Sequence, residues 1–426
     1  MTVLSRLLKF EKKIENKKPD WRKYLLYTLS AVMLTAPLFV PGMVRAAEPE
    51  SEYEKEGGQD KEESKRPVSW EFKDGVLTVS GEGEMPDYSG TEEVPWIAVR
   101  DSVRKIVIEE GITSIGKQSF SNFENLEEVV FPETLKIIGN GAFFECSSLA
   151  HVILPESVER LGAGAFAGCR SLASFSGKGV VIFENFVFER TALTSFEIPE
   201  KTTKVRALTF LGTPVGEYTV QSGNTEFSAK DGVLFNADRS KLEIYPAEKE
   251  EKGYQIPEGC TEIGCYAFRD VKNLKSIDLT GVVSLEEGAF YGASLSGKLI
   301  LPDSLTKLEG GFLFENCTAI KQVNAGNHLK KIAARTFTGC DALTEVKLPQ
   351  SITWADEHAF PDTAKVTCEN TELVRFGKNG FHYAEQVSVL GTRDYQMTFQ
   401  VLSLVNEERS RDFHQSIWMP DCCSQL

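Results

Sequence analysis

The sequence predicts a repeat solenoid of about ten turns, each of 22–24 residues and each built from one parallel β-strand and one short helical turn. Three observations lead to this prediction. Ten phenylalanines recur at intervals of 23, 23, 22, 22, 58, 22, 24, 23 and 23 residues, a run of ten apolar motifs accompanies them, and only one interval is stretched. The phenylalanines are Phe120, Phe143, Phe166, Phe188, Phe210, Phe268, Phe290, Phe314, Phe337 and Phe360.

Each copy of the repeat divides into two parts, as residues 149–169 (LAHVILPESVERLGAGAFAGC) illustrate. The Leu-x-x-Val-x-Leu part alternates apolar and polar residues at its end, which is typical of a short strand, and proline then ends the strand because it has no N–H for pairing. The Ile/Leu-Gly-x-x-Ala-Phe part spaces its apolar residues three to four apart, which suits one helical turn. A single copy cannot cover its own apolar face, so stacked copies must bury it.

The first 100 residues precede the repeats and divide into three segments. Residues 1–46 combine a basic stretch, an apolar stretch from Tyr24 to Val40, and small residues before Ala47, which predicts a cleaved secretory signal. A membrane anchor that is retained is the alternative, although about 17 apolar residues broken by Pro37 are few for a bilayer. Residues 47–67 have the composition of a disordered acidic spacer. Residues 68–100 contain two short strands around Asp74-Gly75 and should form an N-terminal β cap.

The solenoid proper should span residues 101–368, and its stretched interval predicts an inserted β-hairpin at about 214–256. Turn signals at Asp231-Gly232 and at 236–240 separate β-rich runs there. Residues 369–395 then look like a linker. Residues 396–426 begin with an amphipathic segment whose Val401, Leu404 and Val405 share one helical face.

The repeated Ile/Leu-Gly-x-x-Ala-Phe-x-x-Cys followed by Leu-x-x-Val-x-Leu-Pro resembles the BspA-like leucine-rich repeat family, over roughly 68–368. This resemblance implies an exported bacterial protein that is displayed at the surface or secreted and that adheres to host or bacterial proteins without catalysis. The Leu-Val-Asn-Glu-Glu-Arg segment at 404–409 is similar to the first helix of the CAP superfamily. Because the chain ends 15 residues after Arg411, we interpret 396–426 as a truncated CAP-like helix with an unmatched tail; a chance amphipathic helix is the alternative.

The residues that could carry chemistry do not form a known catalytic or metal-binding pattern. The five histidines are scattered, and neither HExxH, CxxC, G-x-S-x-G nor a P-loop occurs. Cys146, Cys169, Cys317 and Cys340 each follow a repeat phenylalanine by three residues, where other copies have Phe, Val, Ala or Thr. A buried slot for a small thiol therefore explains them better than a zinc site or a disulfide series. Cys260 and Cys265 could bridge locally, but we favour thiols. No enzyme activity, cofactor or metal is predicted.

Charge excludes nucleic acid as a partner. The chain carries a formal charge of −15, and loss of residues 1–46, with nine basic and three acidic residues, would make it −21. A body this acidic cannot neutralise phosphates, which requires clustered lysine and arginine. After signal cleavage no segment is apolar for long enough to cross a membrane.

A protein ligand is the partner that the geometry of repeats favours. Solenoids present long concave surfaces, and the outward residues of the strands line them. We therefore take the outward strand positions as the candidate protein-binding face, with simple solvated residues as the alternative. These positions are Glu128, Val130, His151, Ile153, Ser195, Glu197, Ser276, Asp278, Gln322, Asn324, Glu345 and Lys347. Val130 and Ile153 should be neighbours in the stack and form a small apolar patch.

The function expected from these observations is a secreted or cell-surface protein that binds another protein through its solenoid face. Two other interpretations remain open at this stage. The solenoid could be a structural spacer that presents a C-terminal CAP-type domain, truncated in this chain. Alternatively, an intact CAP domain in another reading frame could make the protein an enzyme or a lipid binder.

Overall fold

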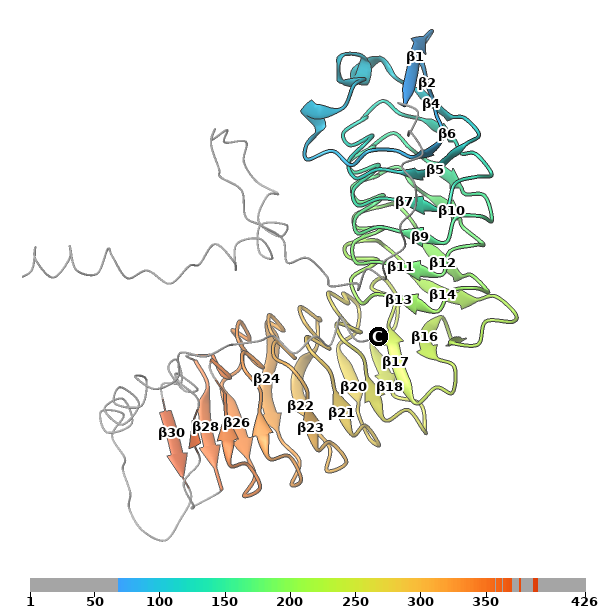
Figure 1. Ribbon diagram of the computed structural model, residues 1–426. Coiled ribbons are helices and arrows are strands. Elements are labelled where there is room, and N and C mark those ends of the chain that lie inside the picture. Colours follow the sequence, from blue (N-terminus) through green and yellow to red (C-terminus); the bar gives the residue numbers. More distant parts are fainter. Residues whose placement is uncertain (1–67, 357, 362, 370–374, 377–385, 390–426) are drawn as a thin grey trace, which may run out of the picture. The chain divides into compact units, whose positions relative to one another are not determined.

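The computed structural model describes residues 68–356, 358–361, 363–369, 375–376 and 386–389. The expected secretory signal (1–46), spacer (47–67) and CAP-like helix (396–426) lie outside these residues, as does most of the expected linker (369–395). Within the described part the chain winds into a parallel β-solenoid with very little helix (Figure 1), which confirms the predicted fold class. Its only helices there are two short 3₁₀ segments, η1 (Thr91–Glu93) and η2 (Ile97–Ser102).

One side of the solenoid is formed by the strands that begin the repeats, which we call the major strands. Within a sheet, consecutive major strands pair in parallel, as β8 and β10 do with Val152 opposite Phe175. They group into five sheets that follow one another along the chain. The major strands are β4 (Lys105–Ile108), β6 (Glu128–Val130), β8 (His151–Ile153), β10 (Ser174–Ser176), β12 (Ser195–Ile198), β14 (Glu217–Val220), β18 (Gly253–Gln255), β20 (Ser276–Asp278), β22 (Ser296–Ile300), β24 (Ala319–Asn324), β26 (Glu345–Leu348), β28 (Lys365–Cys368) and β30 (Gln386–Val389).

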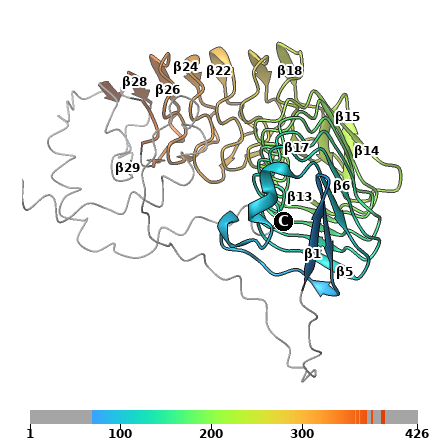
Figure 2. The same ribbon diagram turned by 90° about the horizontal axis from the view of Figure 1, so that it is seen from above.

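A second side is formed by shorter strands, the minor strands, which also pair in parallel and mostly span two residues. Figure 2, which views the molecule from above, shows successive turns of the N-terminal part overlying one another. The minor strands are β3 (Gly83–Glu84), β5 (Ile112–Ile115), β7 (Ile137–Ile138), β9 (Arg160–Leu161), β11 (Ile182–Phe183), β13 (Lys204–Val205), β17 (Lys241–Ile244), β19 (Glu262–Ile263), β21 (Ser284–Leu285), β23 (Lys307–Leu308), β25 (Lys331–Ile332), β27 (Trp354–Ala355) and β29 (Arg375–Phe376).

The third side consists of turn segments, which run from two residues before to two residues after each repeat phenylalanine. We expected one helical turn here; the structure has successive i→i+3 turns whose other amides bond to the next repeat. The amide of Phe143 donates to the carbonyl of Ala165 at 2.9 Å, and that of Glu145 to Ala167 at 2.7 Å. The residues at either end have left-handed backbone, as Gly141 (φ 58°) and Glu145 (φ 56°) do, which a helix would not allow.

The repeat phenylalanines are buried and stack on one another through the core. Phe143 and Phe166 lie 5.4 Å apart between ring centroids with planes inclined by only 2°. There are two such stacks among the described residues. The first begins at Trp96, 5.2 Å from Phe120, and ends at Phe210; the second begins at Tyr245, 4.8 Å from Phe268, and ends at Phe360. The buried core divides into two clusters at the same point.

The stretched interval contains the predicted hairpin. Strands β15 (Phe227–Lys230) and β16 (Val233–Asn236) pair antiparallel around Asp231-Gly232, whose φ angles of 53° and 78° suit a tight hairpin turn. β16 then pairs antiparallel with β17, and β17 pairs in parallel with β19. The hairpin thus lies between a major and a minor strand of one turn, which explains why the repeat resumes unchanged after it.

A second hairpin stands at the start of the described chain. Strands β1 (Ser69–Lys73) and β2 (Val76–Ser80) pair antiparallel around Asp74-Gly75, and β2 pairs in parallel with β4. β2 therefore extends the sheet of major strands in parallel, and β1 adds one antiparallel strand at the edge of that sheet. Leu77 and Val79 of β2 are fully buried, whereas β1 is largely exposed. This arrangement covers the apolar end of the first repeats.

Candidate functional site

The outward residues of the major strands form two rows along the solenoid. In β8, Val152 is buried while His151 and Ile153 on either side are exposed, because successive side chains of a strand point to opposite faces. The same alternation holds in β12 and over the last three residues of β24, Gln322–Asn324. In-register pairing aligns equivalent positions of neighbouring repeats: Lys105 lies opposite Glu128, and Val107 opposite Val130. Each outward row therefore takes one residue from each repeat.

All twelve residues predicted for the binding face lie in these rows, and most are open to solvent. Asn324 and Glu345 are half-buried. The division of the major strands into separate sheets limits how far the rows are continuous, since β6 and β8 belong to different sheets. The ten exposed members are Glu128, Val130, His151, Ile153, Ser195, Glu197, Ser276, Asp278, Gln322 and Lys347.

An apolar strip crosses the N-terminal part of this face at the second outward position. Val107 and Val130 are directly opposite in β4 and β6, and Ile153 holds the same position in the next repeat. Val130 is 39% exposed and Ile153 is 74% exposed. Sequence reasoning omitted Val107, and it also missed Ile300 in β22, which is 58% exposed and lies opposite Asn324. The Leu299-Ile300-Leu301-Pro302 run carries the strand signature that could have identified Ile300.

Many polar side chains of the face form hydrogen bonds or ion pairs with polar side chains of neighbouring repeats. Lys105 Nζ lies 2.8 Å from Glu128 Oε1, and Gln322 Nε2 donates to Glu345 Oε2 at 2.8 Å. His151 Nδ1 and Ser174 Oγ are 3.1 Å apart. Such exposed pairs contribute only about 0–1 kcal/mol each, so a partner could displace them at small cost. The outer side of the apolar strip is not covered by other side chains of the face. Burial of this strip by a partner would therefore give the largest hydrophobic gain in binding free energy.

Potential metal ligands are not clustered in the described residues. No group of three or more His, Cys, Asp or Glu there is arranged to hold a metal ion. Six cysteines of that part, Cys260 and Cys265 included, are buried and form no disulfide. Within the same part of the chain, no helix has the length and apolar character that crossing a bilayer requires.

Comparison with known proteins gives one family and several structures. A family model described as "BspA type Leucine rich repeat region (6 copies)" matches residues 99–215 and 248–385. A leucine-rich repeat protein from Eubacterium ventriosum is 26% identical, with a TM-score of 0.65 over 77% of this chain and 95% of that one. The pneumococcal vaccine antigen PcpA is 19% identical, with a TM-score of 0.55 over 77% and 98%.

A leucine-rich cell surface protein from Faecalibacterium prausnitzii is 21% identical, with a TM-score of 0.50 over 76% of this chain and 94% of that one. At this identity the last two likenesses concern the fold alone. A search among curated proteins found no match.

Proposed function

Because the chain belongs to the BspA-type leucine-rich repeat family, we propose that it is an exported protein, secreted or held at the cell surface, that binds another protein through the outward face of its major strands. Binding of this kind needs neither a cofactor nor catalysis. The predicted secretory signal at 1–46 and the acidic net charge are consistent with an extracellular protein. The F. prausnitzii protein of similar fold is described as a cell surface protein.

The observation that carries the proposal is the apolar strip of Val107, Val130 and Ile153. A strand residue that faces solvent in a soluble solenoid is normally polar, and isolated exceptions need no explanation. Here three β-branched apolar residues occupy the same position in successive repeats, with charged and hydrogen-bonding side chains beside them in the other row. An apolar centre with a polar surround is the usual composition of a protein-binding patch.

The proposal is tested by a binding screen of the purified protein against extracellular-matrix proteins and against whole host and bacterial cells. The test variant is Val130→Lys combined with Ile153→Lys, which places two charges in the strip while leaving the buried residues of β6 and β8 unchanged. The matched control is Ile300→Lys, which changes an exposed isoleucine of the same row in β22. We expect saturable binding that falls at least tenfold in the double variant and is retained in the control.

Two other results would argue against the proposal in different ways. Binding that survives the double variant would keep an adhesive function but move the site away from the strip. An absence of binding to every protein and cell tested would favour the interpretation of the solenoid as a spacer for a C-terminal domain.

A further inference from the structure

The main-chain hydrogen bonds that join consecutive turn segments are interrupted at Phe210. In eight other turn segments the amide of the repeat phenylalanine donates to a carbonyl of the next repeat, as Phe188 does to Thr209 at 2.9 Å. Phe210 and Gly212 occupy the donor positions of their segment, yet neither amide has a partner among the described residues. The eight bonded phenylalanines are Phe120, Phe143, Phe166, Phe188, Phe268, Phe290, Phe314 and Phe337.

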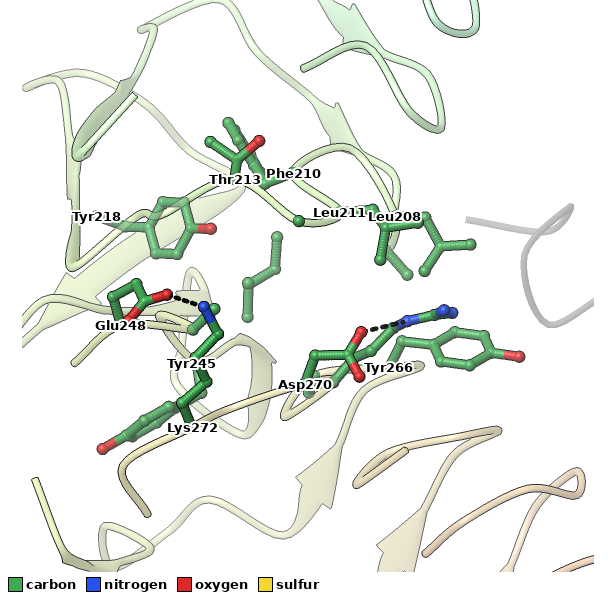
Figure 3. A pocket seen from close by; sticks show the side chains of 16 residues that line it. Leu208, Phe210, Leu211, Thr213, Tyr218, Tyr245, Glu248, Tyr266, Asp270 and Lys272 are labelled. Carbon is green, nitrogen blue, oxygen red and sulfur yellow. Dashed lines mark hydrogen bonds and ion pairs between the residues drawn. The ribbon is translucent and has the colours of Figure 1, made fainter. Parts of the chain in front are cut away.

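A cavity of about 80 Å³ lies where these bonds are missing, between the end of the first aromatic stack and the start of the second. Figure 3 shows the side chains around it. Leu208, Phe210, Leu211 and Ile244 supply apolar walls. The cavity exists because the next turn, which carries Tyr245, does not continue the stacking of Phe210; Phe210 instead contacts Tyr218 edge-on at 5.4 Å.

The hydroxyl of Tyr218 points into this space (Figure 3). Tyr218 is 2% exposed, and its hydroxyl has no hydrogen-bond partner within the described residues. Burial raises the pKa of Tyr218 far above its usual value, so the group stays protonated and able to donate. A ligand in the cavity that supplies an acceptor would give this hydroxyl a hydrogen-bond partner.

Two ion pairs stand at the rim of the cavity. Arg269 Nε lies 3.2 Å from Asp270 Oδ2, and Lys272 is paired with Glu248. The guanidinium of Arg269 is also held over the ring of Tyr291, with its Cζ 4.7 Å from the ring centroid. The rim therefore presents two cations, each already paired with a carboxylate, and only the Arg269 guanidinium is also held by an aromatic ring.

We propose that this cavity binds a small aliphatic carboxylate of the size of acetate. Its volume has room for roughly three or four non-hydrogen atoms, if each takes about 20–30 Å³. The three groups without partners are donors, and a carboxylate is an acceptor only. Hydrogen bonds from N–H and O–H to an ionised acceptor are about twice as strong as those to a neutral one, and the apolar walls accept the methyl group.

Titration of the full chain with acetate, observed by NMR of protein labelled with ¹⁵N-glycine and ¹⁵N-phenylalanine, tests the proposal. We expect saturable shifts of the Phe210 and Gly212 amide signals. Acetamide has the same shape but no charge, and it should bind at least tenfold more weakly. Equal binding of acetate and acetamide, or shifts that rise linearly without saturation, would overturn the proposal.

Two variants and one control locate the site. Tyr218→Phe removes only the hydroxyl and should weaken acetate binding at least tenfold. Ala247→Leu changes a half-buried residue of the cavity wall and should abolish binding by filling the space. Tyr254→Phe removes a hydroxyl outside the cavity and should leave the affinity within twofold. Unchanged affinity in both test variants would exclude this site, and circular dichroism checks that each variant is folded. These outcomes do not depend on whether the major-strand face binds a protein.

Discussion

The thiol of Cys169 donates a hydrogen bond to the main-chain oxygen of Phe143 in the preceding repeat, with 3.2 Å between the sulfur and oxygen atoms. Cys146, Cys317 and Cys340 make the equivalent bond to Phe120, Phe290 and Phe314. Thr213 also donates to the equivalent oxygen of Phe188. A side chain that can donate a hydrogen bond is therefore favoured at the position three residues after the repeat phenylalanine, which explains why cysteine and threonine recur there.

Burial should make these thiols chemically inert in the folded protein. It raises the pKa of Cys340 to about 12 and that of Cys260 to about 11, and it raises the pKa values of Cys146 and Cys317 in the same direction. Because the thiolate is the nucleophile, we expect iodoacetamide at pH 8 to modify none of these four cysteines until the protein is unfolded. Peptide mass spectrometry with and without urea measures this, and rapid labelling of the native protein at Cys340 would contradict it.

The same thiols should make the protein less stable in alkali. Since their pKa values are higher in the folded state than the value near 8.5 of an unfolded chain, the folded state holds more protons above that pH. The free energy of unfolding should therefore be unaffected by these groups below pH 8.5 and fall as the pH rises toward 12. Urea unfolding at pH 7, 9 and 10 follows the decline, and replacement of Cys340 by Thr should reduce it.

Glu315 should make the free energy of unfolding depend on pH in the acidic range. Burial raises the pKa of Glu315 to about 7, although the guanidinium of Arg335, 2.6 Å away, opposes the shift. The folded state then binds more protons than the unfolded state between about pH 4.5 and pH 7, so stability should fall across this window as the pH rises, by up to about 3 kcal/mol. Glu315→Gln should flatten that slope, whereas Glu345→Gln, at a more exposed carboxylate, should not.

Removal of one ring from an aromatic stack should be costly. Phe166 is fully buried and stacks on Phe143 and Phe188, so Phe166→Ala should lower the free energy of unfolding by about 3–5 kcal/mol. Ile153→Ala, at an exposed position nearby, serves as the control and should change it by about 0.5 kcal/mol or less. Urea denaturation monitored by circular dichroism compares the two, and similar midpoints would mean that the stack is not the principal source of stability.

Where a glycine follows a minor strand, as it does after β5, β7, β9 and β19, it permits the close approach of successive turns. A Cβ on Gly162 would lie 2.6 Å from the amide nitrogen of Asn140 in the preceding turn, whereas a Cβ on Gly90 would meet nothing within 4 Å. We expect Gly162→Ala to destabilise the protein by about 1–3 kcal/mol through overpacking. Gly90→Ala should have an effect within about 0.5 kcal/mol. Thermal unfolding of the two variants side by side decides the point.

The sequence was sufficient to predict the solenoid because the period of the phenylalanines and the alternation in Leu-x-x-Val-x-Leu both report burial directly. It did not reveal that Trp96 and Tyr245 begin the two stacks. Trp96 precedes Phe120 by 24 residues and Tyr245 precedes Phe268 by 23, so a count of all aromatic residues would have found both. The helical turn was expected because the apolar spacing of three to four is shared by a helix and by successive turns.

Left-handed backbone at Phe186 (φ 65°) and Tyr266 (φ 51°) shows why the turn segments were hard to predict: bulky residues occupy positions that favour glycine. The outward rows could be predicted from strand alternation alone. Their division into separate sheets could not, because it depends on small differences in how consecutive turns pack. The cavity at Tyr218 was also beyond prediction, since it arises from a mismatch in stacking around the inserted hairpin.

The bonds between consecutive turns have a mechanical consequence. Except beside Phe210, each turn of the described solenoid is joined to the next by main-chain hydrogen bonds of the turn segments and by contacts between stacked rings. A protein pulled between two surfaces along the direction of stacking would bear that tension on one set of bonds after another, and it would lengthen turn by turn. The turns beside Phe210, where the turn-segment bonds are missing, should separate first. The solenoid would then lengthen at this point and lower the tension before either attached end is pulled free.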